Sequence, residues 1–218
     1  MYSFLIVTHV LGWVFWLGTD LGVLLAAKYS EKSELSPETR LKVLEVGMIL
    51  DMAPRIAVPV VFMTGFGLMT SLGIETYVPM MGVLAFGAVW LLAVLTGIAT
   101  EGGQGTLGGI AMKTQFLFNV VVAIGMGGVG VAALFGMLDQ PTWIALKWLS
   151  YGVIALAAIV LEITFKPAIA LYGRLGEEGG SPELDSALTK SLKPVYVSVL
   201  VIYAATLVAG VSGLLKFV

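Results

Sequence analysis

Residues 8–20 read THVLGWVFWLGTD and place two ionisable side chains inside a run that is otherwise apolar enough to cross a bilayer. His9 is the only histidine in the chain, and Asp20 follows it eleven residues later. Because each residue of an α-helix turns by about 100°, the two side chains are expected on nearly the same face, about three turns apart. Trp13 and Trp16 stand four and seven residues after His9, at positions that flank it with aromatic surface.

Ionisable groups at membrane depth are costly, so by default they mark functional sites or face the interior of a helix bundle. This makes the stretch around His9 a candidate binding site. The alternative is structural, since a single histidine near a helix end also forms hydrogen bonds at the membrane interface. Both interpretations stay open at the level of the sequence.

The composition is that of a membrane protein. Hydrophobic residues make up 58% of the chain, charged residues make up 12%, and the mean hydropathy is +0.98. Soluble domains carry about 25% charged residues. The absence of cysteine excludes disulfides, thiolate metal sites and iron–sulfur clusters held by the protein. The net charge is −2 and no segment is polybasic, so the expected partner is the lipid bilayer, and no nucleic acid is expected.

Six apolar runs predict an all-α fold, a single polytopic bundle of about six transmembrane helices, because a span needs about 20 residues. No basic region precedes the first run, so it is expected to be a helix and not a cleaved signal peptide. Ser36 followed by Pro37 is typical of a helix start. The glycine-rich stretch 125–130 is expected to pack closely against a neighbouring helix. The predicted spans are 2–27, 46–72, 77–99, 112–137, 143–172 and 191–217.

The distribution of lysine and arginine predicts the orientation. In a six-helix scheme one face of the membrane receives most of the basic residues, whereas the other face receives only Lys147 and Lys216. The positive-inside rule makes the first face cytoplasmic and puts both termini on the external side, as expected for a protein of a bacterial inner membrane. The basic residues of the first face are Lys28, Lys32, Arg40, Lys42, Lys113, Lys166, Arg174, Lys190 and Lys193.

Two pairs of opposite charge stand four residues apart, the spacing at which side chains meet on one helix face. They are Asp51 with Arg55 and Glu162 with Lys166. Structural ion pairs are the simpler interpretation, favoured for the second pair. The first pair also has Pro54 beside it, which perturbs a helix backbone, so together with Asp20 it is a candidate proton or anion site.

Lys147 is the external counterpart of His9. Both residues are expected about two turns inside their helices from the same membrane face, so they are predicted to approach one another across the bundle. The alternative for Lys147 is that its ammonium group extends to the interface, as lysines near helix ends commonly do.

These residues together resemble a known family. The pattern looks like that of the small four-helix HemJ-type protoporphyrinogen oxidases and the related CopD-like membrane domains, over the first, second, fifth and sixth helices. In that family the first-helix histidine and the lysine after a tryptophan are thought to bind haem and support activity, which the resemblance transfers to His9 and Lys147. The matching positions are His9-x-x-Gly12-x-Val14-x-Trp16, Pro59, Gly65, Trp143-x-x-x-Lys147 and Lys193-Pro194.

The first functional hypothesis is therefore a membrane oxidoreductase that binds haem b and acts on a porphyrin. His9 would be the metal ligand and Lys147 a second ligand or a substrate contact. The other residues of this candidate site are Trp13 and Trp16, which would line the pocket, and Asp20, Asp51 and Arg55, which would hold the porphyrin propionates or pass protons.

Two other classes of function stay open. A transporter or copper-handling CopD-like protein would use some of the ten methionines as soft ligands for Cu(I). A non-catalytic membrane subunit of a larger complex would use the glycine-rich fourth helix as its packing face. An electron-transfer partner and a homo-oligomer are compatible with each of these hypotheses.

Overall fold

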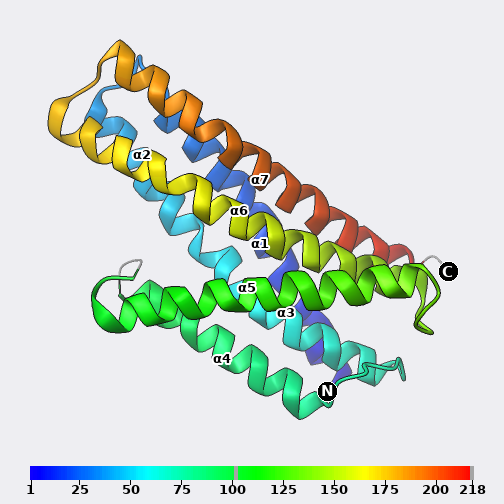
Figure 1. The fold of residues 1–218 in the computed structure, drawn as a ribbon. Coiled ribbons are helices and arrows are strands. Elements are labelled where there is room, and N and C mark those ends of the chain that lie inside the picture. Colours follow the sequence, from blue (N-terminus) through cyan, green and yellow to red (C-terminus); the bar gives the residue numbers. More distant parts are fainter. Residues whose placement is uncertain (101–102, 217–218) are drawn as a thin grey trace.

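The computed structural model describes residues 1–100 and 103–216, and within these ranges the chain forms helices and no strands (Figure 1). This confirms the all-α prediction. Six helical segments of the described chain are long and apolar enough to cross a membrane, with α2 and α3 counted as one span. The elements are α1 (Tyr2–Ser30), α2 (Pro37–Leu50), α3 (Met52–Ser71), α4 (Met80–Ala99), α5 (Gly105–Leu134), α6 (Thr142–Glu178) and α7 (Pro182–Leu215).

Several helices extend beyond the apolar runs that predicted them. Helix α6 continues to Glu178, past the predicted end at residue 172, and α7 begins at Pro182, nine residues before the predicted start at residue 191. The length of an apolar run is set by the thickness of the bilayer that it crosses. The ends of a helix are set by where its backbone groups find other hydrogen-bond partners, which can lie outside the bilayer. The Ser181 hydroxyl accepts a hydrogen bond from Leu184 N, which caps the start of α7 in a polar segment. The predicted end of this span at residue 217 lies outside the described residues.

Helix α2 begins where the sequence predicted. The Ser36 hydroxyl accepts a hydrogen bond from Thr39 N and Pro37 occupies the first helical turn. This confirms the predicted cap and explains why the helix starts well before the apolar run at residue 46.

The second span is interrupted between α2 and α3. Helix α2 ends at Leu50, Asp51 lies between the two helices, and α3 restarts at Met52. Pro54 has no amide hydrogen to donate to the carbonyl of Leu50, so the regular hydrogen-bond ladder fails at this point. Asp51 is therefore held at a break in the backbone, partway along the second span.

Helices α6 and α7 run side by side in opposite directions, with α5 along the other side of α6 and α1 behind them (Figure 1). Glycine allows α5 and α6 to approach closely, since a Cβ atom added at Gly152 would lie 2.5 Å from the backbone nitrogen of Gly127. This confirms close packing of part of the glycine-rich stretch. Gly125 and Gly128 have no neighbour within 4 Å of such an atom.

Aromatic side chains attach α4 to the rest of the bundle. Trp90 stacks on Phe118 of α5 with ring centres 5.7 Å apart and planes inclined by 5°. Phe62 of α3 contacts both Trp90 and Phe86, with ring centres 6.2 and 5.4 Å away. Helix α4 is thereby fixed between α3 and α5, on the side of the bundle away from α7.

Candidate functional site

Helix α1 packs against α2 and α3 in one continuous antiparallel register. A Cβ atom added at Gly12 would lie 2.8 Å from Val61, and one added at Gly22 would lie 2.8 Å from Leu50. Both spacings are too short for ordinary contact, so the absence of a side chain at these glycines lets the helices meet. This register places the residues around His9 opposite Thr64 and places Asp20 opposite the break at Asp51.

His9 is hydrogen-bonded to α3. Its Nδ1 atom lies 3.0 Å from the hydroxyl oxygen of Thr64, and that hydroxyl also lies 2.7 Å from the carbonyl oxygen of Val60. A carbonyl cannot donate, so the Thr64 proton points to Val60 and the Thr64 oxygen accepts from Nδ1 of His9. This arrangement fits the tautomer of His9 with its proton on Nδ1 and its lone pair on Nε2, and the imidazole also interacts with the backbone of Val61.

The ring of His9 lies close against the backbone of α3. A Cβ atom added at Gly65 would lie 3.2 Å from the Cε1 atom of His9, closer than most side-chain contacts. Gly65 thus leaves the space that the imidazole occupies. This glycine also belongs to the pattern that resembles the HemJ-type proteins.

Lys147 of α6 lies within electrostatic range of His9. Its aliphatic chain and ammonium group pack on the glycine surface of α7, because a Cβ atom added at Gly213 would lie 2.5 Å from Nζ. The structure therefore puts these two candidate residues, from helices α1 and α6, within range of an electrostatic interaction, although no hydrogen bond or ion pair of the described residues joins them.

The two tryptophans of α1 take part in helix packing. The indole nitrogen of Trp13 donates to the carbonyl oxygen of Thr206, 2.9 Å away, and its ring occupies the space above Gly210 of α7. Trp16 is 3% exposed and meets Tyr151 edge to face, with ring centres 6.2 Å apart. Trp13 therefore joins α1 to α7, while Trp16 belongs to the core between α1 and α6.

Asp20 lies in a second group of charged residues. It faces Asp51, whose carboxylate is 2.6 Å from the guanidinium group of Arg55. This confirms the predicted Asp51–Arg55 ion pair. Glu162 of α6 adds a further negative charge near Arg55.

The second predicted ion pair, Glu162 with Lys166, is not formed. Among the ion pairs of the described residues, none joins Glu162 to Lys166. Glu162 is partly buried and interacts with Arg55, whereas Lys166 is exposed on the outside of α6. Tertiary packing therefore puts Glu162 within electrostatic range of an arginine on another helix, and the spacing of four residues does not produce the predicted pair.

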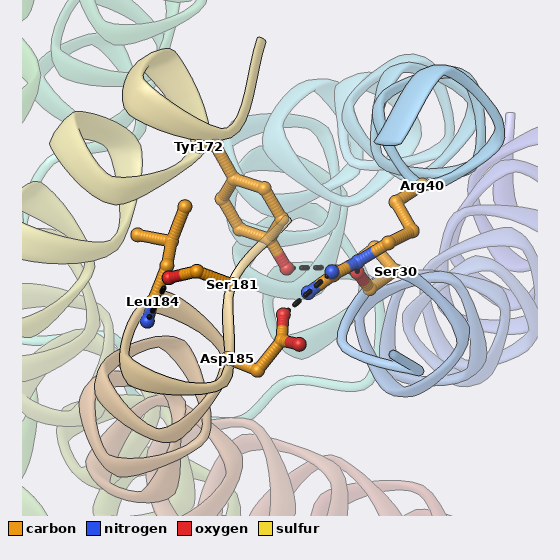
Figure 2. Close-up of polar contacts among 6 residues, drawn as sticks. All are labelled: Ser30, Arg40, Tyr172, Ser181, Leu184 and Asp185. Atoms are coloured by element: carbon orange, nitrogen blue, oxygen red, sulfur yellow. Dashed lines mark hydrogen bonds and ion pairs between the residues drawn. The ribbon is translucent and has the colours of Figure 1, made fainter. Parts of the chain in front are cut away.

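A buried arginine at the loop end of the bundle was not apparent from the sequence (Figure 2). Arg40 is 1% exposed, its Nε donates to the Ser30 carbonyl at 2.8 Å, and its Nη1 donates to Asp185 at 2.7 Å. Tyr172 donates to the Ser30 hydroxyl, 2.6 Å away, since that hydroxyl proton is used on Ala27. The cluster joins the end of α1 and the starts of α2 and α7 to α6.

Sequence patterns had assigned Arg40 only to the basic face of the membrane. Its partner Asp185 lies 145 positions later, so no local spacing connects the two residues. The one available signal was that Asp185 falls in the first turn of a helix that begins at Ser181 and Pro182, where a carboxylate is favourable. That signal explains why a carboxylate is favourable at position 185, but it does not identify Arg40 as the partner of Asp185.

Within the part of the chain that the structure describes, no three histidine or acidic side chains converge on a point where they could hold a metal ion. No family model, curated protein or solved structure matches this chain.

Proposed function

We propose that this integral membrane protein binds haem b through Nε2 of His9 and acts as a redox protein. The observation that carries the proposal is the hydrogen bond from Nδ1 of His9 to Thr64, which leaves the lone pair on Nε2. Histidines that ligate metals almost always donate their other ring nitrogen in this way, because the donation fixes the tautomer and the ring orientation.

The donor set fits haem better than a metal ion bound by protein ligands alone. His9 supplies one nitrogen ligand, and a porphyrin supplies four more in its plane. Lys147 supplies a positive charge near His9, and an ammonium group is suited to the carboxylates that a porphyrin carries. We therefore assign His9 to the iron and Lys147 to a porphyrin carboxylate, in agreement with the HemJ-like pattern of the sequence.

Bound haem supplies one-electron chemistry, and its potential depends on the axial ligand, on hydrogen bonds to that ligand and on burial. The residues of this chain hold and tune the site. Thr64 orients His9, and Gly65 gives the imidazole its place against α3. Trp13 links α1 to α7 through its bond to the Thr206 carbonyl and the contact of its ring with Gly210.

The test is an absorption spectrum of the detergent-purified full chain, expressed with ample haem, before and after dithionite. A Soret band that shifts on reduction is expected. His9→Gly should remove this band, and added imidazole should restore it by occupying the vacated space. A featureless spectrum of the unchanged protein, or a full Soret band in His9→Gly without imidazole, would contradict the assignment.

The role of Lys147 is tested separately. Lys147→Ala should weaken haem retention or shift the Soret band, whereas Lys147→Arg should preserve much of the wild-type behaviour because it keeps the charge. Lys113→Ala is the matched control, since Lys113 is an exposed lysine on α5. Equal effects of the two alanine variants would show that Lys147 does not contact the porphyrin.

A further inference from the structure

The charged group around Asp20 contains a carboxylate oxygen that no described side chain satisfies. Asp20 is 8% exposed, and its Oδ2 atom is buried without a hydrogen-bond partner. The neighbouring hydroxyl of Thr19 is committed to the carbonyl of Phe15, 2.6 Å away. A buried carboxylate in this position lacks the partners that an ionised group needs.

The groups that face Asp20 are mostly negative. Asp51, at the break before α3, lies within electrostatic range of Asp20, and Arg55 lies within that range of both Asp51 and Glu162 of α6. Arg55 is already paired with Asp51 through a contact of 2.6 Å. The guanidinium group of Arg55 is therefore committed to Asp51, so an ionised Asp20 would add a second negative charge beside Asp51 inside the membrane.

The described neighbours on the side of Trp16 are aromatic or apolar. Trp16 stands one turn before Asp20 and interacts with its carboxyl group. Around Trp16, α7 contributes the apolar side chains of Ile202 and Ala205. The surroundings thus accommodate a neutral carboxylic acid better than a carboxylate, because the acid carries no net charge and can donate its own proton.

We propose that Asp20 binds a proton and exchanges it with Asp51, forming a proton-transfer site between α1, α3 and α6. In the transfer step the O–H bond of Asp20 breaks, the carboxylate of Asp51 takes up the proton, and the negative charge passes to Asp20. Arg55 keeps its place beside Asp51 during the exchange, and its positive charge offsets the negative charge that the pair of carboxyl groups carries.

The geometry of the backbone suits this exchange. Asp51 lies at the break between α2 and α3, where the helix ladder is interrupted beside Pro54. The contact of Gly22 with Leu50 holds α1 against the same point. The proton site does not depend on haem, because His9 lies about 16 Å away along α1 at 1.5 Å per residue.

The test is infrared spectroscopy of the full chain in liposomes, in sodium-free buffer at neutral pH. The C=O stretching band of a protonated carboxylic acid is expected, with a shift in D₂O, and it should be absent from Asp20→Asn. Asp185→Asn is the control and should retain the band, since Asp185 is an ionised partner of Arg40. Gel filtration and circular dichroism verify that Asp20→Asn, which keeps the side-chain shape, is folded.

Three outcomes would overturn the proposal. They are the absence of the band in the unchanged protein, its persistence in Asp20→Asn, and its loss on addition of sodium at constant pH, which would indicate a cation site. Asp51→Asn should keep the band and change its frequency, because the neighbour becomes a neutral amide. An unchanged frequency would show that the two residues do not share the proton. An unaltered haem spectrum in Asp20→Asn is expected and separates this site from the one at His9.

Discussion

The hydroxyl of Thr64 is oriented so that it can accept a hydrogen bond from Nδ1 of His9. It gives its own proton to Val60 and therefore receives the proton of Nδ1. Thr64, which no sequence pattern indicates as functional, thus helps to orient His9, which the sequence does indicate. The same threonine is 9% exposed, so water does not compete for its hydrogen bonds.

Thr64→Val is expected to weaken haem retention about 10–100-fold, the usual effect of losing the outer partner of a metal-bound histidine. Valine keeps the shape of threonine but cannot accept the hydrogen bond from His9. Haem content after dilution of the detergent-purified protein measures the effect. Thr70→Val is the control, because Thr70 bonds only to Phe66 on the same helix. Equal retention in the two variants would contradict the role of Thr64.

The buried guanidinium group of Arg40 depends on Asp185 for its counter-charge. Asp185→Asn leaves the buried guanidinium group without its counter-charge, so the thermal unfolding temperature in detergent should fall clearly. Because Asp185 is 22% exposed, the loss should be smaller than the about 3–5 kcal/mol expected for a fully buried pair.

Arg174→Ala is the comparison for this variant. Arg174 and Glu178 are both 54% exposed, and such surface pairs contribute about 0–1 kcal/mol. Its unfolding temperature should stay close to that of the unchanged protein. If both variants lowered stability equally, burial of Arg40 would not be the cause.

At the scale of the helices, individual glycines decide which surfaces meet. Gly152 lets α6 touch the backbone of α5 at Gly127, whereas a Cβ atom added at Gly125, two residues earlier on α5, would have no neighbour within 4 Å. The glycine-rich stretch of the sequence is therefore only partly a packing surface. Some of its glycines allow close contact with α6, and others have no neighbouring helix.

Gly152→Ala should destabilise the protein by about 1–3 kcal/mol, as overpacking commonly does. The added methyl group would meet backbone atoms of Gly127, which cannot rotate away. Gly125→Ala should be neutral or slightly stabilising, because alanine favours the helix by up to about 1 kcal/mol over glycine. Thermal unfolding of both variants in the same detergent distinguishes them, and equal losses would exclude the close approach of α5 and α6 as the reason.

At the scale of the whole molecule, the arrangement of charges predicts orientation in the membrane. The loop between α1 and α2 should be cytoplasmic, and the loop between α5 and α6 should be external with both termini. The chain has no cysteine, so single-cysteine variants report accessibility without a background signal.

Ser33→Cys and Asp139→Cys place thiols at exposed loop positions on opposite predicted faces. In intact cells a membrane-impermeant maleimide should label Asp139→Cys and leave Ser33→Cys unlabelled until the cells are opened. The reverse pattern would place the termini in the cytoplasm and contradict the predicted topology.

The sequence by itself determined the features that depend on neighbouring residues. Hydropathy predicts membrane-spanning helices because burial in lipid requires about 20 consecutive apolar residues. The cap at Ser36 and the Asp51–Arg55 pair followed from spacings of three and four residues, and the structure contains both.

Tertiary structure alone decided the partners that come from distant helices. Thr64 beside His9, Asp185 beside Arg40 and Arg55 beside Glu162 each depend on how two helices are aligned along their lengths. Where α1 meets α3, the alignment includes close contacts at Gly12 and Gly65, and hydropathy carries no information about it. The sequence therefore identified the ionisable residues of the bundle, and the packing of the helices determined which of them act together.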